Sequence, residues 1–174
     1  MSCYRRRILP GATYFFTVNL AVRGQSLLTD QIDLLRQAYR DTIAENRVFC
    51  DAMVVLPDHL HAVWTLPPGD AGYSERWRRI KARFSHALGQ EQGRSASKAA
   101  KRERGIWQRR FWEHVIRDDA DYARHVTYCW GDPVHHGLVS QAQDWPFSTF
   151  HRDLRAGRVD AAWRPTPMQG RFGE

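Results

Sequence analysis

Two histidines separated by one apolar residue, His59 and His61, are the residues of this sequence best placed to bind a metal. They follow Pro57-Asp58 and open an apolar run that is typical of a β-strand. Residues i and i+2 of a strand point to the same face, with their Cα atoms about 6.5 to 7 Å apart. Neutral imidazole is a common ligand for divalent metals. The pair therefore indicates a metal site, and exposed or packing histidines on a hairpin are the alternative.

Tyr128 and Asp132 form a second pair whose spacing suits chemistry. Residues four apart on a helix share one face, so a carboxylate there could hold a metal whose bound phosphate faces the phenol. The alternatives are a core aromatic with a satisfied hydroxyl for Tyr128, and a helix-end residue for Asp132, because Pro133 disfavours helical ψ just before it. His114 and His125 lie near these residues in the expected elements, and we expect both to have structural roles.

The charge distribution favours a polyanionic partner. The net charge is +7 over 174 residues, but the segment from Arg76 to Arg110 holds twelve Lys or Arg against the two acids Glu91 and Glu103. Such a concentration of cations is the expected footprint of nucleic-acid binding, because phosphate contacts release condensed counterions. A solvated helix face followed by a disordered loop is the alternative.

The cations expected to contact DNA phosphates lie at the N-terminus and within or beside this basic segment. They are Arg5, Arg6, Arg7, Arg76, Arg79, Arg83, Lys98, Lys101, Arg102, Arg104, Arg109 and Arg110. Three tryptophans, Trp77, Trp107 and Trp112, could stack on unpaired bases, although core packing is the favoured role for each of them.

Other features exclude several classes of protein. No run of apolar residues approaches the length of a membrane span, and the N-terminus lacks the apolar region of a secretory signal. Cys3, Cys50 and Cys129 are far apart and odd in number, which favours neither a disulfide framework nor a zinc ribbon. We therefore expect a protein of the reducing cytoplasm.

Three strands and a helix are predicted for the first half of the chain. Residues 12–20 are dense in aromatic and β-branched side chains, and residues 49–56 and 60–66 form two further strands joined as a hairpin. Between them, Thr29 can cap a helix. Its apolar positions fall at helical spacing and are Ile32, Leu35, Tyr39 and Ile43.

The second half begins with a helix that Ser74 can cap and Gly89 can end. Its arginines are expected to lie largely off the buried stripe, which comprises Trp77, Ile80, Phe84 and Leu88. Residues 90–105 are polar and basic and indicate a mobile loop.

A fourth strand is predicted over residues 111–116, and a final helix from Asp118 to about Trp130, stopped by Gly131 and Pro133. The order of elements matches the split βαβ pattern of an α+β, ferredoxin-like fold. This pattern predicts an antiparallel four-stranded sheet with helices on one face, plus a C-terminal helix carrying the tyrosine. We expect one domain over residues 1–153 and a flexible basic tail over residues 154–174.

Longer stretches of the sequence resemble a known family. His59-Leu60-His61 looks like the HUH motif of single-strand nucleases and transposases, and the whole run VVLPDHLHAVWTLP is similar to that of REP-associated tyrosine transposases, which belong with the IS200-like single-tyrosine transposases. The resemblance covers residues 4 to 153 in order. It continues in GATYFFTVNL, WQRRFWEHVIRD, HVTYCWGDPVHHGLV and DWPFSTFHRD.

The resemblance implies the roles of the site residues. His59 and His61 would bind Mg²⁺ or Mn²⁺, and Tyr128 would be the nucleophile. The third ligand, usually Asn or Gln in this family, is here Asp132, which keeps an oxygen ligand but adds a negative charge that favours the cation and repels a scissile phosphate. The lysine of the family's Asn-Pro-Val-Lys-His-Gly pattern is replaced by His135.

The implied activity is metal-dependent cleavage and joining of single-stranded DNA at REP-type hairpins, through a 5′-phosphotyrosine and without ATP. A monomer is expected, with a dimer as the alternative. A non-catalytic DNA- or RNA-binding module derived from a transposase remains open because of Asp132. A replication initiator or relaxase is disfavoured, because no helicase segment or second catalytic tyrosine is evident.

Overall fold

The computed structural model of the chain describes residues 8–89, 104–166 and 172–173. Most of the predicted loop over residues 90–105 lies outside these ranges. Six of the predicted DNA contacts also lie outside them, namely Arg5, Arg6, Arg7, Lys98, Lys101 and Arg102. The elements are β1 (Thr13–Asn19), α1 (Leu27–Asp30), α2 (Ile32–Glu45), β2 (Phe49–Val55), β3 (His59–Thr65), α3 (Tyr73–Leu88), β4 (Trp112–Val115), α5 (Asp119–His135), the 3-10 helix η1 (Ala142–Asp144) and α6 (Phe150–Arg155).

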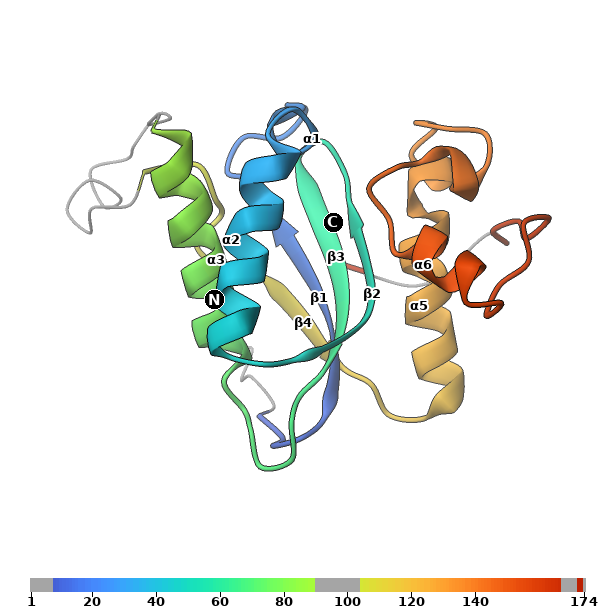
Figure 1. Ribbon diagram of the computed structural model, residues 1–174, viewed down its shortest axis with the longest axis horizontal. Coiled ribbons are helices and arrows are strands. Elements are labelled where there is room, and N and C mark those ends of the chain that lie inside the picture. The colour runs from blue at the N-terminus through green and yellow to red at the C-terminus, as the bar shows by residue number, and fades with distance from the viewer. Residues whose placement is uncertain (1–7, 90–103, 167–171, 174) are drawn as a thin grey trace.

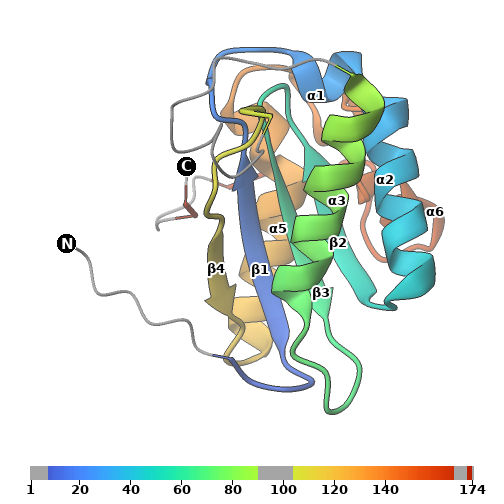
Figure 2. The same ribbon diagram turned by 90° about the vertical axis from the view of Figure 1, so that its left-hand side faces the viewer.

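The four strands form one antiparallel sheet in the order β2-β3-β1-β4. β2 and β3 form the predicted hairpin, and β4 pairs with β1 at the opposite edge. This strand order is the one that a split βαβ pattern produces, so the predicted α+β, ferredoxin-like fold is confirmed. Figures 1 and 2 show α2 and α3 against one face of the sheet and α5 against the other.

Alternating side chains of the strands supply two cores, because successive strand residues point to opposite faces. Tyr14 and Phe16 of β1 belong to the core under α2 and α3. Phe15 belongs to the core under α5. The register pairs Thr17 with His61 and Asn19 with His59. The sheet therefore presents a cluster of polar side chains to α5, at the end of β1 and the start of β3.

The prediction that the arginines of α3 lie off its buried stripe is wrong for Arg76. Its side chain is buried and donates to both carboxylate oxygens of Asp70 and to the carbonyls of Asn46 and Arg47. It thereby ties the start of α3 to the end of α2. The helix also begins one residue before Ser74, with Gly72 at its N-cap position.

The predicted end of the last helix near Trp130 is also wrong, because α5 continues through Gly131 and Pro133 to His135. Proline removes one backbone donor, but the helix resumes with the amide of His136 bonded to the carbonyl of Asp132 at 3.0 Å. Gly131 permits a close approach, since a Cβ there would lie 2.6 Å from the Cβ of Pro165. Asp118 caps the other end by accepting from the amide of Asp121.

The segment after α5 packs back onto the sheet. The carbonyl of Phe147 accepts a hydrogen bond from the amide of Val55, and the amide of Thr149 donates one to the carbonyl of Met53. This segment therefore follows the edge of β2. The predicted domain boundary at Asp153 falls inside α6, and both Trp163 and Phe172 pack with the core under α5. In the described ranges, none of the helices combines the length and hydropathy that crossing a bilayer requires.

Candidate active site

The structure brings the predicted metal ligands together between β3 and α5. Nε2 of His61 lies 3.3 Å from Oδ2 of Asp132, and Nε2 of His59 lies 3.9 Å from the same oxygen. The i,i+2 spacing on β3 and the continuous helix α5 account for this geometry, because both histidines point toward the face that carries Asp132. All three side chains are buried.

His59 is held in one orientation by Asp58. Its Nδ1 donates to Oδ1 of Asp58 at 2.7 Å, while the other oxygen of that carboxylate accepts from the amide of Gly24 at 2.6 Å and forms an ion pair with Nε of Arg23 at 3.1 Å. Burial, reinforced by the neighbouring His61, lowers the pKa of His59 to about 4. The ring is therefore neutral at pH 7, and its Nε2 lone pair faces Asp132.

His61 is oriented by Thr17 of β1. Its Nδ1 lies 2.8 Å from the Thr17 hydroxyl, which donates in turn to the backbone carbonyl of Phe172. Since that hydroxyl gives its proton to Phe172, it accepts from His61, and Nδ1 must carry the ring proton. Nε2 of His61 is then an acceptor aimed at Asp132, as a metal ligand requires.

The carboxylate of Asp132 is buried, and neither of its oxygens has a hydrogen-bond donor among the described residues. The same holds for Nε2 of His59. A buried, unpaired carboxylate is costly unless a cation compensates it. Two imidazole nitrogens and a carboxylate oxygen are suitable ligands for a divalent metal such as Mn²⁺. The residues present therefore fit a metal ion.

His136 also belongs to this cluster and was missed by the sequence analysis. Its Nε2 lies 3.5 Å from Oδ1 of Asp132, and its ring is 5.2 Å from that of His59. Ligand atoms of His59, Asp132 and His136 all lie within 4.8 Å of one another. The i,i+4 spacing of Asp132 and His136 was the available signal, but the predicted end of the helix before Pro133 concealed it.

Tyr128 lies beside the histidines, one turn before Asp132. Its ring centroid is 5.1 Å from that of His61 at a near-perpendicular angle. The ring of Phe172 stacks on that of Tyr128 at 3.8 Å between centroids and 12° between planes. Only 6% of Tyr128 is exposed as a result. The tyrosine and the candidate metal ligands thus lie in one site, which Phe172 covers.

Comparisons with known proteins agree with this geometry. No protein-family model matches the chain. It is 47% identical over 163 residues to the REP-associated tyrosine transposase of Escherichia coli (strain K12), covering 94% of this chain and 91% of the relative. It is 44% identical over 168 residues to a putative REP-associated tyrosine transposase of Haemophilus influenzae, covering 96% of each. The chain belongs to the REP-associated tyrosine transposase family.

A solved structure supports the same assignment at the level of the fold. The structure of a REP-associated tyrosine transposase bound to a REP hairpin superimposes with a TM-score of 0.90 at 45% sequence identity, over 100% of this chain and 98% of the other. The likeness therefore includes the C-terminal segment as well as the sheet. It identifies the present chain as a tyrosine transposase enzyme.

A second polar cluster of this transposase lies at the start of α5. Nε2 of His114 lies 2.8 Å from Oδ2 of Asp121, which also accepts from Arg117, while Oδ1 of Asp121 accepts from Arg124. The ring of His125 stacks on that of His114 at 4.7 Å and contacts the backbone carbonyl of Asp121. Burial lowers the pKa of His125 to about 4. The cluster joins β4 to α5.

The predicted DNA contacts of the transposase within the described residues occupy different environments. Arg79 pairs with Glu45 and Glu75, and Arg83 pairs with Glu45, and both arginines are half-buried. Arg76 is committed to its buried contacts and is no longer a candidate. The others lie in the segment leading to β4 and are Arg104, Arg109 and Arg110.

Proposed function

We propose that this transposase cuts and rejoins single-stranded DNA at REP-type hairpins, with Tyr128 as the nucleophile. The observation that supports this most directly is the contact of the Tyr128 ring with His61, inside the cluster completed by His59 and Asp132. The REP hairpin as substrate is supported by the solved relative, whose fold covers this whole chain.

In the proposed cleavage, the phenolic oxygen of Tyr128 loses its proton and attacks the phosphorus of a phosphodiester. The bond from phosphorus to the 3′ oxygen breaks, that oxygen takes up a proton, and the 5′ phosphate remains on the tyrosine. The 3′ hydroxyl later attacks this linkage, restores the phenol and rejoins the strands. The phosphotyrosine retains the energy of the broken bond, so no ATP is needed.

His59, His61 and Asp132 would hold the divalent metal, Mg²⁺ or Mn²⁺, and His136 is placed to add a fourth contact. When bound, the ion supplies Lewis-acid stabilisation of the charge that develops on the phosphate. Asp58 and Thr17 orient the two histidines by hydrogen bonds to Nδ1. Asp132 adds a negative charge beside the phosphate, which makes the metal necessary for the phosphate to approach.

Tyr128→Phe tests the nucleophile. This change removes one oxygen and keeps the ring, so stacking on Phe172 and hairpin affinity should persist while nicking and the covalent protein–DNA adduct disappear. Tyr122→Phe is the matched control on the same helix, since the hydroxyl of Tyr122 instead donates to Asp51 at 3.2 Å. A Tyr128→Phe protein that still forms the adduct would exclude this residue as the nucleophile.

A second candidate function is hairpin binding without cleavage. It is favoured by the burial of Tyr128 under Phe172 and by Asp132 in place of the family's neutral ligand. Tight hairpin binding by the parent protein without any adduct in Mg²⁺ or Mn²⁺ would support this function. Recovery of the adduct in Asp132→Asn would then identify the carboxylate as its cause.

We also propose that one monomer suffices, because Tyr128 and the proposed metal ligands of one chain already lie together. Since its proposed substrate is DNA, we propose that it works in the cytoplasm near the bacterial nucleoid. Mixing Tyr128→Phe with His61→Ala tests this. If each chain uses its own tyrosine, the mixture stays inactive, whereas restored cleavage would show that a dimer shares residues between its sites.

A further inference from the structure

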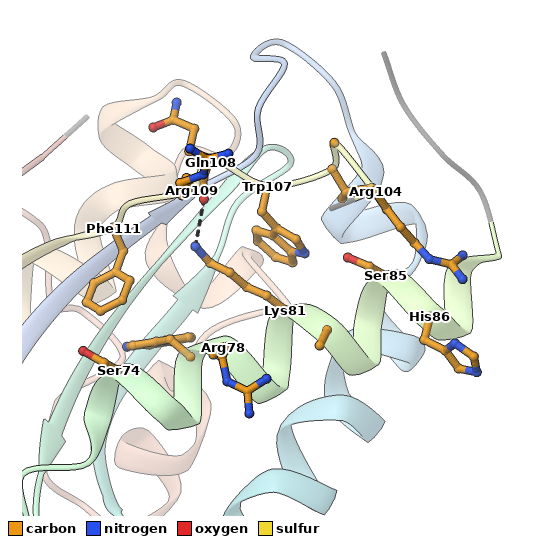
Figure 3. Close-up of a pocket in the computed structure, with 14 residues that line it drawn as sticks. Ser74, Arg78, Lys81, Ser85, His86, Arg104, Trp107, Gln108, Arg109 and Phe111 are labelled. Atoms are coloured by element: carbon orange, nitrogen blue, oxygen red, sulfur yellow. Dashed lines mark hydrogen bonds between the residues drawn. The ribbon is translucent and has the colours of Figure 1, made fainter. Parts of the chain in front are cut away.

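A cavity of about 740 Å³ lies between α3 and residues 104–111, on the face of the sheet opposite Tyr128. Figure 3 shows side chains of α3 forming one wall and Trp107 and Phe111 facing them from the other. The volume is within the range of small-molecule and nucleotide sites. This cavity has no part in the chemistry proposed for Tyr128.

Aromatic rings form the interior of the cavity. Trp77 and Trp107 are buried, and Phe111 is half-buried. The indole N–H groups of both tryptophans are buried and have no hydrogen-bond acceptor among the described residues. Because these N–H groups are buried, they are not accessible to a ligand in the cavity, and the half-buried ring of Phe111 is the main aromatic face that a ligand can contact.

The mouth of the cavity is cationic. Arg78, Lys81, Arg104 and Arg109 line it, and none of its described lining residues is acidic. The ammonium of Lys81 lies 5.8 Å from the ring centroid of Trp107 and 5.6 Å from that of Phe111, and it donates to the carbonyl of Gln108 at 3.0 Å (Figure 3). Arg78 pairs with Glu75 outside the cavity, and such exposed pairs exchange at little cost.

We propose that this cavity binds one unpaired nucleotide of the DNA, with its base against the aromatic rings and its phosphate on the cations. Cations interleaved with aromatic faces are the usual means of binding unpaired nucleic acid. A bare phosphate would leave the aromatic face unused, and a purely apolar ligand would leave the cations unused. The inference rests on the proposed function only in taking DNA as the ligand.

The position of the cavity separates it from the cleavage site. β4 is the edge strand between the two faces, and residues 104–111 lead directly into it. A DNA strand held in the cavity can reach Tyr128 by passing over this edge, where Arg110 is exposed. The nucleotide in the cavity is therefore a different one from the nucleotide that is cut, and its binding can be measured without metal.

The test compares metal-free binding of oligothymidylate with binding of an abasic oligomer of equal length. The parent protein should bind oligothymidylate about tenfold more tightly, because a stacked base adds affinity. Phe111→Leu keeps apolar volume but removes a ring face, and it should abolish most of this difference. Phe147→Leu is the matched control, since Phe147 is a half-buried phenylalanine of the same core outside this cavity.

Charge removal tests the phosphate contacts separately. Lys81→Gln combined with Arg109→Gln should weaken binding of both oligomers and lower the log–log salt slope by about 1.4, since each phosphate contact on a single strand contributes about 0.7. Arg36→Gln combined with Arg40→Gln removes equal charge from α2, away from the cavity, and should have a smaller effect on both quantities.

Equal affinity of the parent protein for the two oligomers would overturn the proposal, as would equal losses in the Phe111→Leu and Phe147→Leu proteins. Competition by polyglutamate as effective as that by oligothymidylate would show a general anion surface instead. The adduct assay on a REP hairpin reports independently on Tyr128. An adduct without base discrimination refutes only the cavity, and base discrimination without an adduct refutes only the cleavage.

Discussion

Two clusters of histidine and aspartate lie along α5, and they differ in what their carboxylates contact. Asp121 accepts hydrogen bonds from His114, Arg117 and Arg124. Asp132 is equally buried, yet its oxygens have no donor among the described residues and face the Nε2 atoms of His59 and His61. Ligand atoms of each cluster lie close enough together to hold an ion.

This difference separates a structural cluster from a candidate metal site. Arginines compensate the charge of Asp121, so a cation there would have to displace them and meet their repulsion. The charge of Asp132 is left for a cation to compensate. Residue types and spacing are similar in the two clusters. What distinguishes them is whether the carboxylate accepts hydrogen bonds from protein donors.

The largest effect is expected from Asp132→Ala. It should abolish the covalent adduct with a REP hairpin, because one ligand of the metal is lost. Without metal, the variant should be as stable as the parent or more so, since a buried unpaired carboxylate has been removed. Thermal unfolding with and without Mn²⁺ checks this: Mn²⁺ should raise the Tm of the parent and not that of the variant. An equal rise in both would exclude Asp132 as a ligand.

Asp121→Ala should have the opposite character. It removes the buried acceptor shared by His114 and by the exposed Arg117 and Arg124, and the loss of hydrogen bonds to a charged group costs about 1.5 to 3 kcal/mol of unfolding free energy. Urea unfolding measures the loss, and the response of the Tm to Mn²⁺ should be retained. If instead the free energy of unfolding is unchanged and the response of the Tm to Mn²⁺ disappears, Asp121 and not Asp132 belongs to the metal site.

Removal of the hydrogen bond behind a ligand should have an intermediate effect. Asp58→Asn weakens the contact that orients His59, and such changes usually lower metal affinity about 10- to 100-fold. Calorimetric titration with Mn²⁺ gives the affinity directly. Asp33→Asn on α2 is the control, because Asp33 is exposed and far from the site. Equal affinities in the two variants would mean that Asp58 acts only in folding.

Low pH should destabilise the protein through the cluster around Asp121. Desolvation opposes ionisation of Asp121, but hydrogen bonds from Arg117, His114 and Arg124 together hold its pKa well below the usual value. The resulting stabilisation is complete above the unfolded pKa of about 4 and is lost as pH falls through the lower folded pKa. Asp121→Asn should therefore flatten the fall in stability below about pH 4, as measured by urea unfolding. If the variant loses stability below pH 4 as steeply as the parent, other carboxylates cause the loss.

The grouping of the candidate site residues was predictable because their spacing is local. His59 and His61 need only a strand, and Tyr128 and Asp132 only a helix, while the family resemblance brought the two pairs together. The sheet was predictable for the same reason, since each strand has its own alternating pattern and the order of elements left few topologies.

The misses have a common physical cause, which is contact with distant parts of the chain. Pro133 and Gly131 usually end a helix, but α5 continues here because its face packs on the sheet and Gly131 admits Pro165. His136 was missed as a consequence. Arg76 is a surface residue by type, yet it is buried because Asp70 and two carbonyls of the α2–β2 connection satisfy it. Local patterns carry no information on such contacts.

The smallest expected effect is on the rate at which Tyr128 becomes available. Phe172 stacks on its ring, and the carbonyl of Phe172 accepts from the Thr17 hydroxyl that orients His61. An aromatic stack contributes about 0.5 to 1.5 kcal/mol, so Phe172→Ala should speed adduct formation by about three- to tenfold. Single-turnover cleavage of a REP hairpin in Mn²⁺ measures this rate. Phe172→Leu separates the ring from the backbone contact, because it keeps an apolar side chain and the carbonyl but loses the stack; its rate should be intermediate. A fall in rate for Phe172→Ala would show that the C-terminal segment supports the catalytic geometry through Thr17 and His61 more than it covers the tyrosine.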